Sequence, residues 1–87
     1  MIYDSQITQA ITDIDAEASF AMRKFPPFNS AHEGFAVLKE EVDELWDEVK
    51  AKQGARDVEN MRMEAVQVAA MALRFIVDIC DKGRSQV

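Results

Sequence analysis

The stretch AVQVAAMALRFIVDIC, residues 65–80, decides the fold, because as a helix it carries apolar side chains on almost every side. A helix that is apolar all round must be buried all round. Two partner helices of roughly 20 residues each cannot surround it. We therefore predict an all-α fold, in which a three-helix chain forms a four-helix-type bundle by joining further copies of itself.

The first of two preceding helices is predicted over residues 4–24. Six residues recur there at steps of three and four and form one apolar stripe: Ile7, Ile11, Ile14, Ala18, Met22 and Phe25. Pro26 and Pro27 then end the helix, because proline cannot continue its hydrogen bonds and restricts the residue before it. The same pair is compatible with a ligand for a polyproline-binding domain, but a chain break is the simpler interpretation.

Ser30 and Glu33 predict the start of the second helix, because a serine N-cap followed three residues later by glutamate forms a capping box. This helix is predicted to run to about residue 53 and to stop at Gly54. The third helix is predicted over residues 57–82, ending near Gly83. The second helix has its own apolar stripe, formed by Phe35, Leu38, Val42, Leu45, Trp46 and Val49.

Composition indicates a single domain, residues 1–87, with 48% apolar and 30% charged residues. The net charge of −6 argues against a nucleic acid polymer or an anionic membrane as partner. It also means that a phosphate ligand needs a bridging cation. No apolar run is long enough to span a bilayer and no signal peptide is recognised, so the expected location is cytoplasmic.

Three single residues receive structural interpretations. Cys80, the one cysteine, has apolar neighbours and is expected to be a buried thiol rather than a nucleophile. Trp46 lies on an apolar stripe and is assigned to the core in preference to a base-stacking platform. His32 is assigned to capping or surface packing in preference to a nucleotide contact.

Charged residues form two matching strips on the second and third helices. At about 100° per residue, Glu41, Glu44 and Glu48 share one strip that flanks the core. On the third helix the strip holds Glu64, Gln67, Met71, Arg74 and Asp78. Polar groups on a buried helix are costly unless they find partners. Three interpretations remain open: a solvated acidic face, a salt-bridge seam in which Arg74 pairs with Glu44 or Glu48, and a metal site.

The metal interpretation follows from the repulsion between the carboxylates. Two of them about 6 Å apart at an effective dielectric of about 20 repel by roughly 2–3 kcal/mol. One arginine cannot offset three or four such groups, whereas a hard divalent cation can. Mg²⁺, or Mn²⁺ as the alternative, takes oxygen ligands and combines a few carboxylates with waters and substrate phosphates.

Two motifs carry a family resemblance. Glu41-Val42-Asp43-Glu44 is followed by Leu45, and Glu64-Ala65-Val66-Gln67 begins 20 residues after Glu44 and precedes the apolar run. The stretch from residue 30 to residue 79 resembles the MazG-like, all-α nucleotide pyrophosphohydrolases, which show Glu-x-x-Glu on one helix and Glu-x-x-Asp on the next. Gln67 departs from this pattern, because it stands where the family has a metal-binding aspartate.

The resemblance implies a Mg²⁺-dependent nucleoside triphosphate pyrophosphohydrolase that cleaves an NTP or dNTP to the monophosphate and pyrophosphate. The apolar surface of the third helix, independently of the resemblance, predicts a homo-oligomer, either a dimer or a tetramer. The alternative is a catalytically impaired helical oligomer that binds nucleotide or protein. The implied metal ligands are Glu41, Glu44, Glu64 and Gln67. The implied catalytic residues are Glu41, Glu44 and Glu48, and Glu48 would act as a fourth ligand or as the general base. The implied phosphate contacts are Arg74, Lys24 and Lys50.

Overall fold

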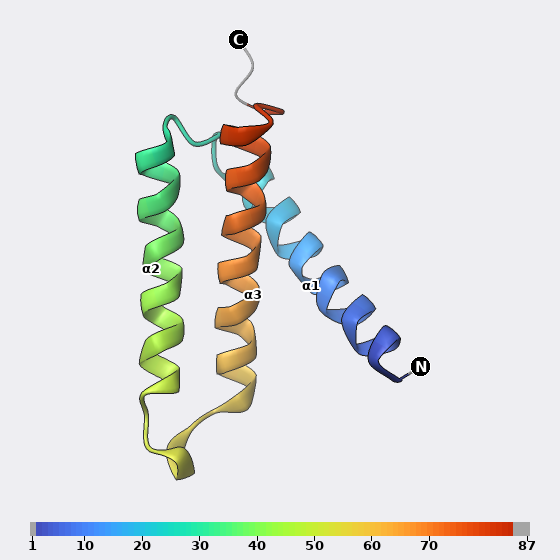
Figure 1. Cartoon of the computed structure of the whole chain (residues 1–87), viewed down its shortest axis with the longest axis vertical. Coiled ribbons are helices and arrows are strands. Elements are labelled where there is room, and N and C mark those ends of the chain that lie inside the picture. The colour runs from blue at the N-terminus through green and yellow to red at the C-terminus, as the bar shows by residue number, and fades with distance from the viewer. Residues whose placement is uncertain (1, 85–87) are drawn as a thin grey trace.

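The computed structural model describes residues 2–84, without the side chains of Ile2, Tyr3 and Gln53, and this part of the chain is helical with no strand. Its elements are α1 (Ile2–Lys24), α2 (Ala31–Val49), a 3₁₀ turn η1 (Gln53–Ala55), α3 (Val58–Phe75) and a π-helical turn η2 (Ile76–Cys80). α3 packs against both other helices and lies between them (Figure 1). The predicted all-α, three-helix chain is confirmed.

α2 begins as predicted and ends earlier than predicted. The Ser30 hydroxyl accepts a hydrogen bond from the Glu33 N–H at 3.0 Å, and the Glu33 carboxylate accepts one from the Asn29 N–H at 3.0 Å. At the other end, α2 stops at Val49 rather than near residue 53. The Arg56 Nε donates a hydrogen bond to the Val49 carbonyl at 2.9 Å. The last carbonyl groups of a helix have no hydrogen-bond donor within the helix, and this side chain supplies one.

The third helix was expected to be α-helical to about residue 82, but its last turn widens into η2. A π turn is an uncommon feature of helices, and here it contains Asp78, which is 1% exposed. Its carboxylate accepts hydrogen bonds from the Phe28 N–H at 3.1 Å and from Arg84 at 2.7 and 3.0 Å. Arg84 also donates to the Met22 carbonyl at 2.6 Å. Asp78 and Arg84 therefore join the end of α3 to the end of α1 and to the loop that follows it.

Cys80 and Trp46 correct two expectations. Cys80 is exposed rather than buried, because a residue two places after the inward-facing Asp78 lies nearly on the opposite side of the helix. Trp46 is 58% exposed rather than part of the core, because only one edge of the apolar stripe on α2 faces α3. Trp46 lies with Phe35 and Val42 among the exposed apolar residues of α2.

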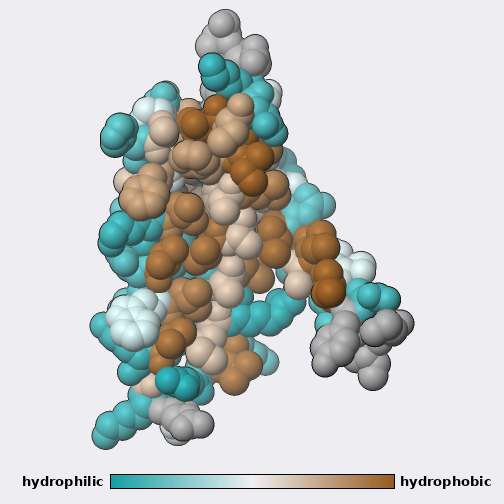
Figure 2. Space-filling model, viewed as in Figure 1, coloured by the Kyte–Doolittle hydropathy of each residue, from teal (hydrophilic) through white to brown (hydrophobic). Residues whose placement is uncertain are grey.

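The core of the single chain is small for its composition. The buried apolar residues of the described chain are Ala18, Ala21, Phe28, Ala70 and Met71. The first turns of α1 diverge from α3 (Figure 1), and they leave Ile7 and Ile11 54% and 60% exposed. Figure 2 shows apolar residues running over α2, α3 and the neighbouring part of α1 on one face. The helices thus bury only part of their apolar stripes against one another.

Gly34 allows the first turn of α2 to approach the aromatic end of the core. A Cβ atom at this position would lie 2.8 Å from the Phe75 ring and 3.1 Å from the Phe28 ring. Gly54 is the opposite case, because a Cβ there would meet nothing within 4 Å.

We expect Gly34→Ala to destabilise the protein. Because a Cβ 2.8 Å from the Phe75 ring is closer than an ordinary contact, overpacking should cost about 2–3 kcal/mol, the upper part of its usual range. The better helix propensity of alanine returns about 1 kcal/mol, so the net loss should be roughly 1–2 kcal/mol. Urea unfolding measures it, with Gly54→Ala as the matched control that should change stability little. A Gly34→Ala variant at least as stable as the parent would contradict the close packing of α2 on Phe28 and Phe75.

Candidate functional site

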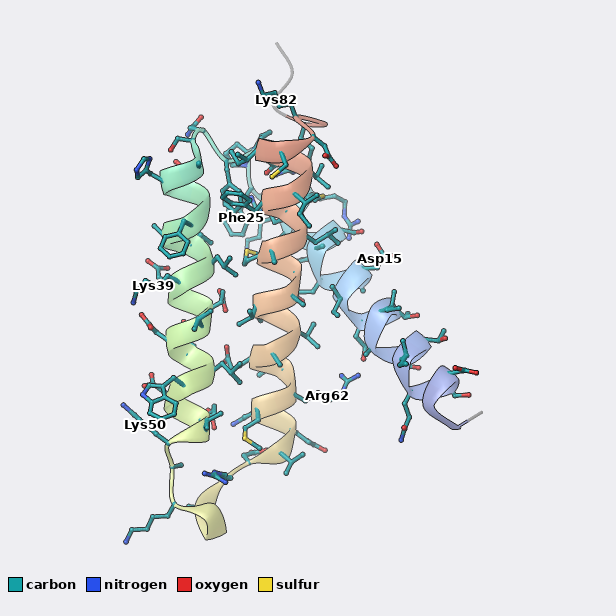
Figure 3. All side chains as sticks on the ribbon, in the orientation of Figure 1. Asp15, Phe25, Lys39, Lys50, Arg62 and Lys82 are labelled. Atoms are coloured by element: carbon teal, nitrogen blue, oxygen red, sulfur yellow. The ribbon has the colours of Figure 1, made fainter. Side chains whose placement is uncertain are left out.

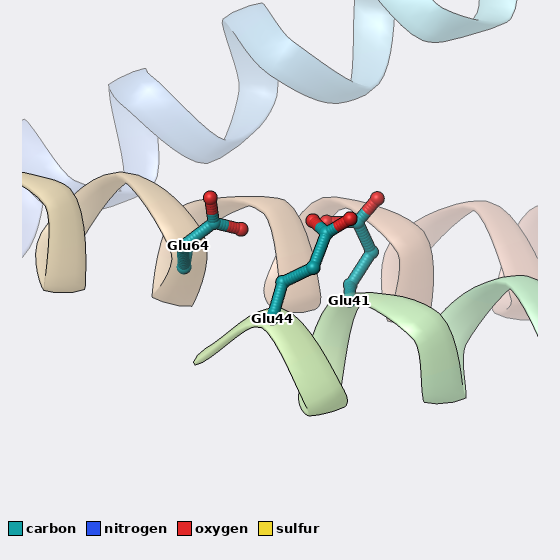
Figure 4. Close-up of side chains that lie close together, drawn as sticks. All are labelled: Glu41, Glu44 and Glu64. Atoms are coloured by element: carbon teal, nitrogen blue, oxygen red, sulfur yellow. The ribbon is translucent and has the colours of Figure 1, made fainter. Parts of the chain in front are cut away.

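Three glutamates from two helices meet between α2 and α3. Glu41 and Glu44 are three residues apart and share one face of α2, and the adjacent α3 brings Glu64 opposite them (Figure 4). One carboxylate oxygen from each residue lies within 4.8 Å of the others. None of the three forms an ion pair with a lysine or arginine in the described part of the chain. We refer to Glu41, Glu44 and Glu64 as the glutamate cluster.

The electrostatics of the glutamate cluster disfavour three negative charges. Burial is the largest of the causes that raise the pKa of Glu41 from 4.5 to about 7. The charge of Glu44, a hydrogen bond with Glu44 and the charge of Glu64 follow in that order. Burial also raises the pKa of Glu64, with Glu44 as the next cause. The Glu64 Oε2 is buried and has no hydrogen-bond donor among the described residues. A buried acceptor without a partner is destabilising, so the cluster favours a proton or a cation.

Glu48 and Gln67, two further residues predicted for this site, lie on its margins. The charge of Glu48 contributes to raising the pKa of Glu64, so Glu48 is a neighbour of the cluster without sharing its short oxygen spacing. The amide of Gln67 donates to the Glu17 carboxylate of α1 at 2.8 Å. The structure thus directs the nitrogen of Gln67 towards α1, and sequence reasoning did not foresee Glu17 as its partner.

Arg74 forms no salt bridge with Glu44 or Glu48, so the salt-bridge seam is absent from the described chain. The Arg74 side chain is buried, and its guanidinium lies 4.3 Å from the centroid of the Phe28 ring. It donates to the Pro26 carbonyl at 3.2 Å and contacts the Met71 sulfur at 3.5 Å, while its Nε has no acceptor. Burial, followed by the charge of Arg84, lowers the pKa of Arg74.

The two predicted lysines lie in different places. Lys24 is exposed at the end of α1, with its Nζ 5.6 Å and 5.5 Å from the ring centroids of Phe20 and Phe25. Lys50 pairs with Asp47 at 3.2 Å on the surface. In Figure 3, Lys50 lies at the opposite end of the helices from Phe25. Within one chain, Lys24 is therefore close to Phe20 and Phe25, whereas Lys50 is remote from Phe25.

A cavity of about 370 Å³ adjoins the glutamate cluster, and Glu41 belongs to both. Its apolar wall includes Phe20, Phe25 and Phe28, and its polar wall is formed by Glu17, Glu33, Glu41, Gln67 and Arg74. Of these residues, only Glu41, Gln67 and Arg74 were predicted for the site. For Glu17 and Phe20, the one sequence signal is a three-residue spacing that sets them on the same face of α1.

Comparison of the chain with models of known protein families, with curated proteins and with solved structures finds no match. Across the described residues, no helix combines the length and apolar character that a membrane crossing requires.

Stability should fall as pH rises from 5 to 8 in the absence of divalent cations. Because the pKa of Glu41 is raised in the folded state to about 7 from 4.5, its contribution is fully present below about 4.5 and is lost as pH rises through 7. Urea unfolding at pH 5 and pH 8 measures the difference. Glu41→Gln should reduce it, and Asp47→Asn on the solvent face of α2 should not. Equal pH dependence in Glu41→Gln and the parent would show that Glu41 titrates normally.

Proposed function

We propose that the protein is a Mg²⁺-dependent nucleoside triphosphate pyrophosphohydrolase, which uses water to cleave an NTP or dNTP to the monophosphate and pyrophosphate. The observation that carries the proposal is the close approach of the three carboxylates of the glutamate cluster without a cationic side chain. The spacing of the two acidic motifs, which resembles that of MazG-like enzymes, supports it. We also propose a cytoplasmic location, since nucleoside triphosphates are intracellular metabolites.

A hard divalent cation fits the physical state of the cluster. Mg²⁺ prefers six oxygen ligands and usually keeps positions for water and for substrate phosphates. Three carboxylates supply negative charge for the cation and leave such positions open. Mn²⁺ takes similar oxygen ligands and is the alternative. The cation would also offset the repulsion between a protein of net charge −6 and a triphosphate.

The proposed chemistry is an attack of water on the α-phosphorus. A bond forms between the water oxygen and the α-phosphorus, and the bond from that phosphorus to the oxygen bridging the α- and β-phosphates breaks, so pyrophosphate leaves. A bound cation lowers the pKa of water and neutralises phosphate oxygens. Glu41, Glu44 and Glu64 are the proposed metal ligands, and Glu48, beside Glu64, is the proposed fourth ligand or general base. Lys24 is the proposed phosphate contact within the chain.

The alternative is an oligomer that binds nucleotide or protein without hydrolysis. Gln67 favours it, because this neutral residue stands where MazG-like enzymes have an aspartate, and its amide nitrogen is bonded to Glu17. Nucleotide binding is expected of both functions and does not separate them. An assay of triphosphate hydrolysis does, because only the enzyme would release pyrophosphate.

Glu44→Gln should lower pyrophosphate release from nucleoside triphosphates by at least about 100-fold, since even outer-shell partners of a metal contribute roughly 10–100-fold. The assay uses Mg²⁺, Mn²⁺ and EDTA in parallel, and EDTA should abolish release. Asp47→Asn makes the same charge change on the solvent face of α2 and should retain activity. No turnover of any common NTP or dNTP by the parent protein would leave the binding module as the function. Full activity in Glu44→Gln would exclude the glutamate cluster as the catalytic site.

We further infer that the active form is a dimer or tetramer of this chain. In the described part of the chain only five apolar residues are buried, whereas ten large apolar side chains stay exposed. A partner that covers such a surface gains free energy from the apolar area removed from water. The exposed apolar residues include Phe35, Val42 and Trp46, which lie along α2.

Light scattering at micromolar concentration should therefore give a mass of at least twice 9.8 kDa. The single tryptophan, Trp46, reports the interface, because burial in a partner should shift its fluorescence to shorter wavelength. Trp46→Glu should weaken assembly by placing a charge in apolar contact, while Lys39→Glu on the polar face should not. A stable folded monomer in the parent protein would refute the assembly.

A further inference from the structure

The cavity beside the glutamate cluster combines an apolar wall with polar groups of both hydrogen-bonding types. Phe20, Phe25 and Phe28 supply flat aromatic surface. The guanidinium of Arg74 can only donate hydrogen bonds, whereas ionised carboxylates can only accept them. Small-molecule sites typically have this composition, with a few polar groups that fix orientation within a mostly apolar pocket.

Arg74 is the residue that points to a ligand. Its side chain is 4% exposed, and no carboxylate lies within ion-pair distance in the described chain. Its Nε has no acceptor, and its one backbone oxygen acceptor is Pro26. A buried cation needs hydrogen-bond acceptors. The charges of Asp78 and Glu33 also act on Arg74, but neither carboxylate forms an ion pair with it in the described chain. Because Arg74 lines the cavity, a molecule there can bring an oxygen acceptor to its N–H groups.

The charges around the cavity decide what kind of molecule that is. Three carboxylates, Glu17, Glu33 and Glu41, line it together with one guanidinium. This excess of negative charge repels a phosphate. A neutral flat ring is accepted instead, provided that it offers an acceptor to Arg74 and N–H donors to the carboxylates. Arg74, which the sequence assigned to a phosphate contact, is therefore better suited to contact such a ring.

We propose that this cavity binds the nucleobase of the substrate, with the ring against Phe20, a carbonyl oxygen towards Arg74 and N–H groups towards the glutamates. The identity of the ligand as a nucleobase rests on the proposed function. A volume of about 370 Å³ is near the lower end of the roughly 300–1,000 Å³ range of ligand sites, so it holds a base better than a whole triphosphate. Glu41 connects the cavity to the glutamate cluster, where the phosphates would lie.

The chemistry of the wall predicts the preferred bases. Guanine and cytosine carry both a carbonyl oxygen and an amino group, whereas adenine has no carbonyl. Guanosine or cytidine should therefore bind at least about tenfold more tightly than adenosine, since an unfilled hydrogen bond to a charged group costs roughly that factor or more.

The test measures nucleoside binding by NMR titration of the whole protein in EDTA. Nucleosides lack phosphate, so binding does not require a metal. Phe20→Leu should weaken guanosine or cytidine binding by roughly tenfold, because aromatic stacking on a base contributes about that much. Phe35→Leu is the matched control: Phe20 and Phe35 are 50% and 59% exposed, but only Phe20 lines the cavity. Phe35→Leu should leave binding unchanged.

Glu44→Gln separates this inference from the proposed function. The variant should lose hydrolysis and keep nucleoside binding. Selective nucleoside binding that depends on Phe20 supports the cavity even if no triphosphate is hydrolysed. The inference is overturned if millimolar guanosine and cytidine do not bind, if adenosine binds equally well, or if Phe20→Leu and Phe35→Leu behave alike, even when the protein hydrolyses triphosphates.

Discussion

The packing of α3 between α1 and α2 is the constraint on which the rest of the structure depends. α3 is apolar on most of its surface, so burial favours a partner helix on each of two sides. On one side, α2 brings two carboxylates opposite a third, and on the other side, α1 brings aromatic and acidic residues over the same helix. The candidate site therefore results from the way in which α1 and α2 cover α3, and each of its two parts includes residues of α3.

Function and stability make opposite demands on this packing. The glutamate cluster places like charges together at two partly buried positions and one exposed position, and Arg74 is buried with no carboxylate at ion-pair distance in the described chain. Each arrangement costs free energy in the empty protein and would become favourable if the proposed cation and hydrogen-bonding ring were bound. A bound ligand that contacts the folded state alone would also stabilise it.

Helical periodicity was sufficient to predict three helices and the face shared by Glu41 and Glu44, because both depend on neighbours along the chain. Glu64 could be added because a motif spacing related the two helices. Contacts between distant segments were not predictable. Arg84 binds Asp78 and Gln67 binds Glu17, and no local pattern pairs these residues. The exposure of Trp46 also followed from the angle between helices rather than from its position on an apolar stripe.

The contact between Asp78 and Arg84 has a consequence for how the protein is made. The arginine donates two of the hydrogen bonds that a carboxylate only 1% exposed accepts, and removing one member of a buried charged pair is strongly unfavourable. A nascent chain in which residue 84 is still inside the ribosomal tunnel therefore lacks this contact between the end of α3 and the loop after α1. The contact should form only after residue 84 has left the tunnel, and so after the helices that it joins have emerged.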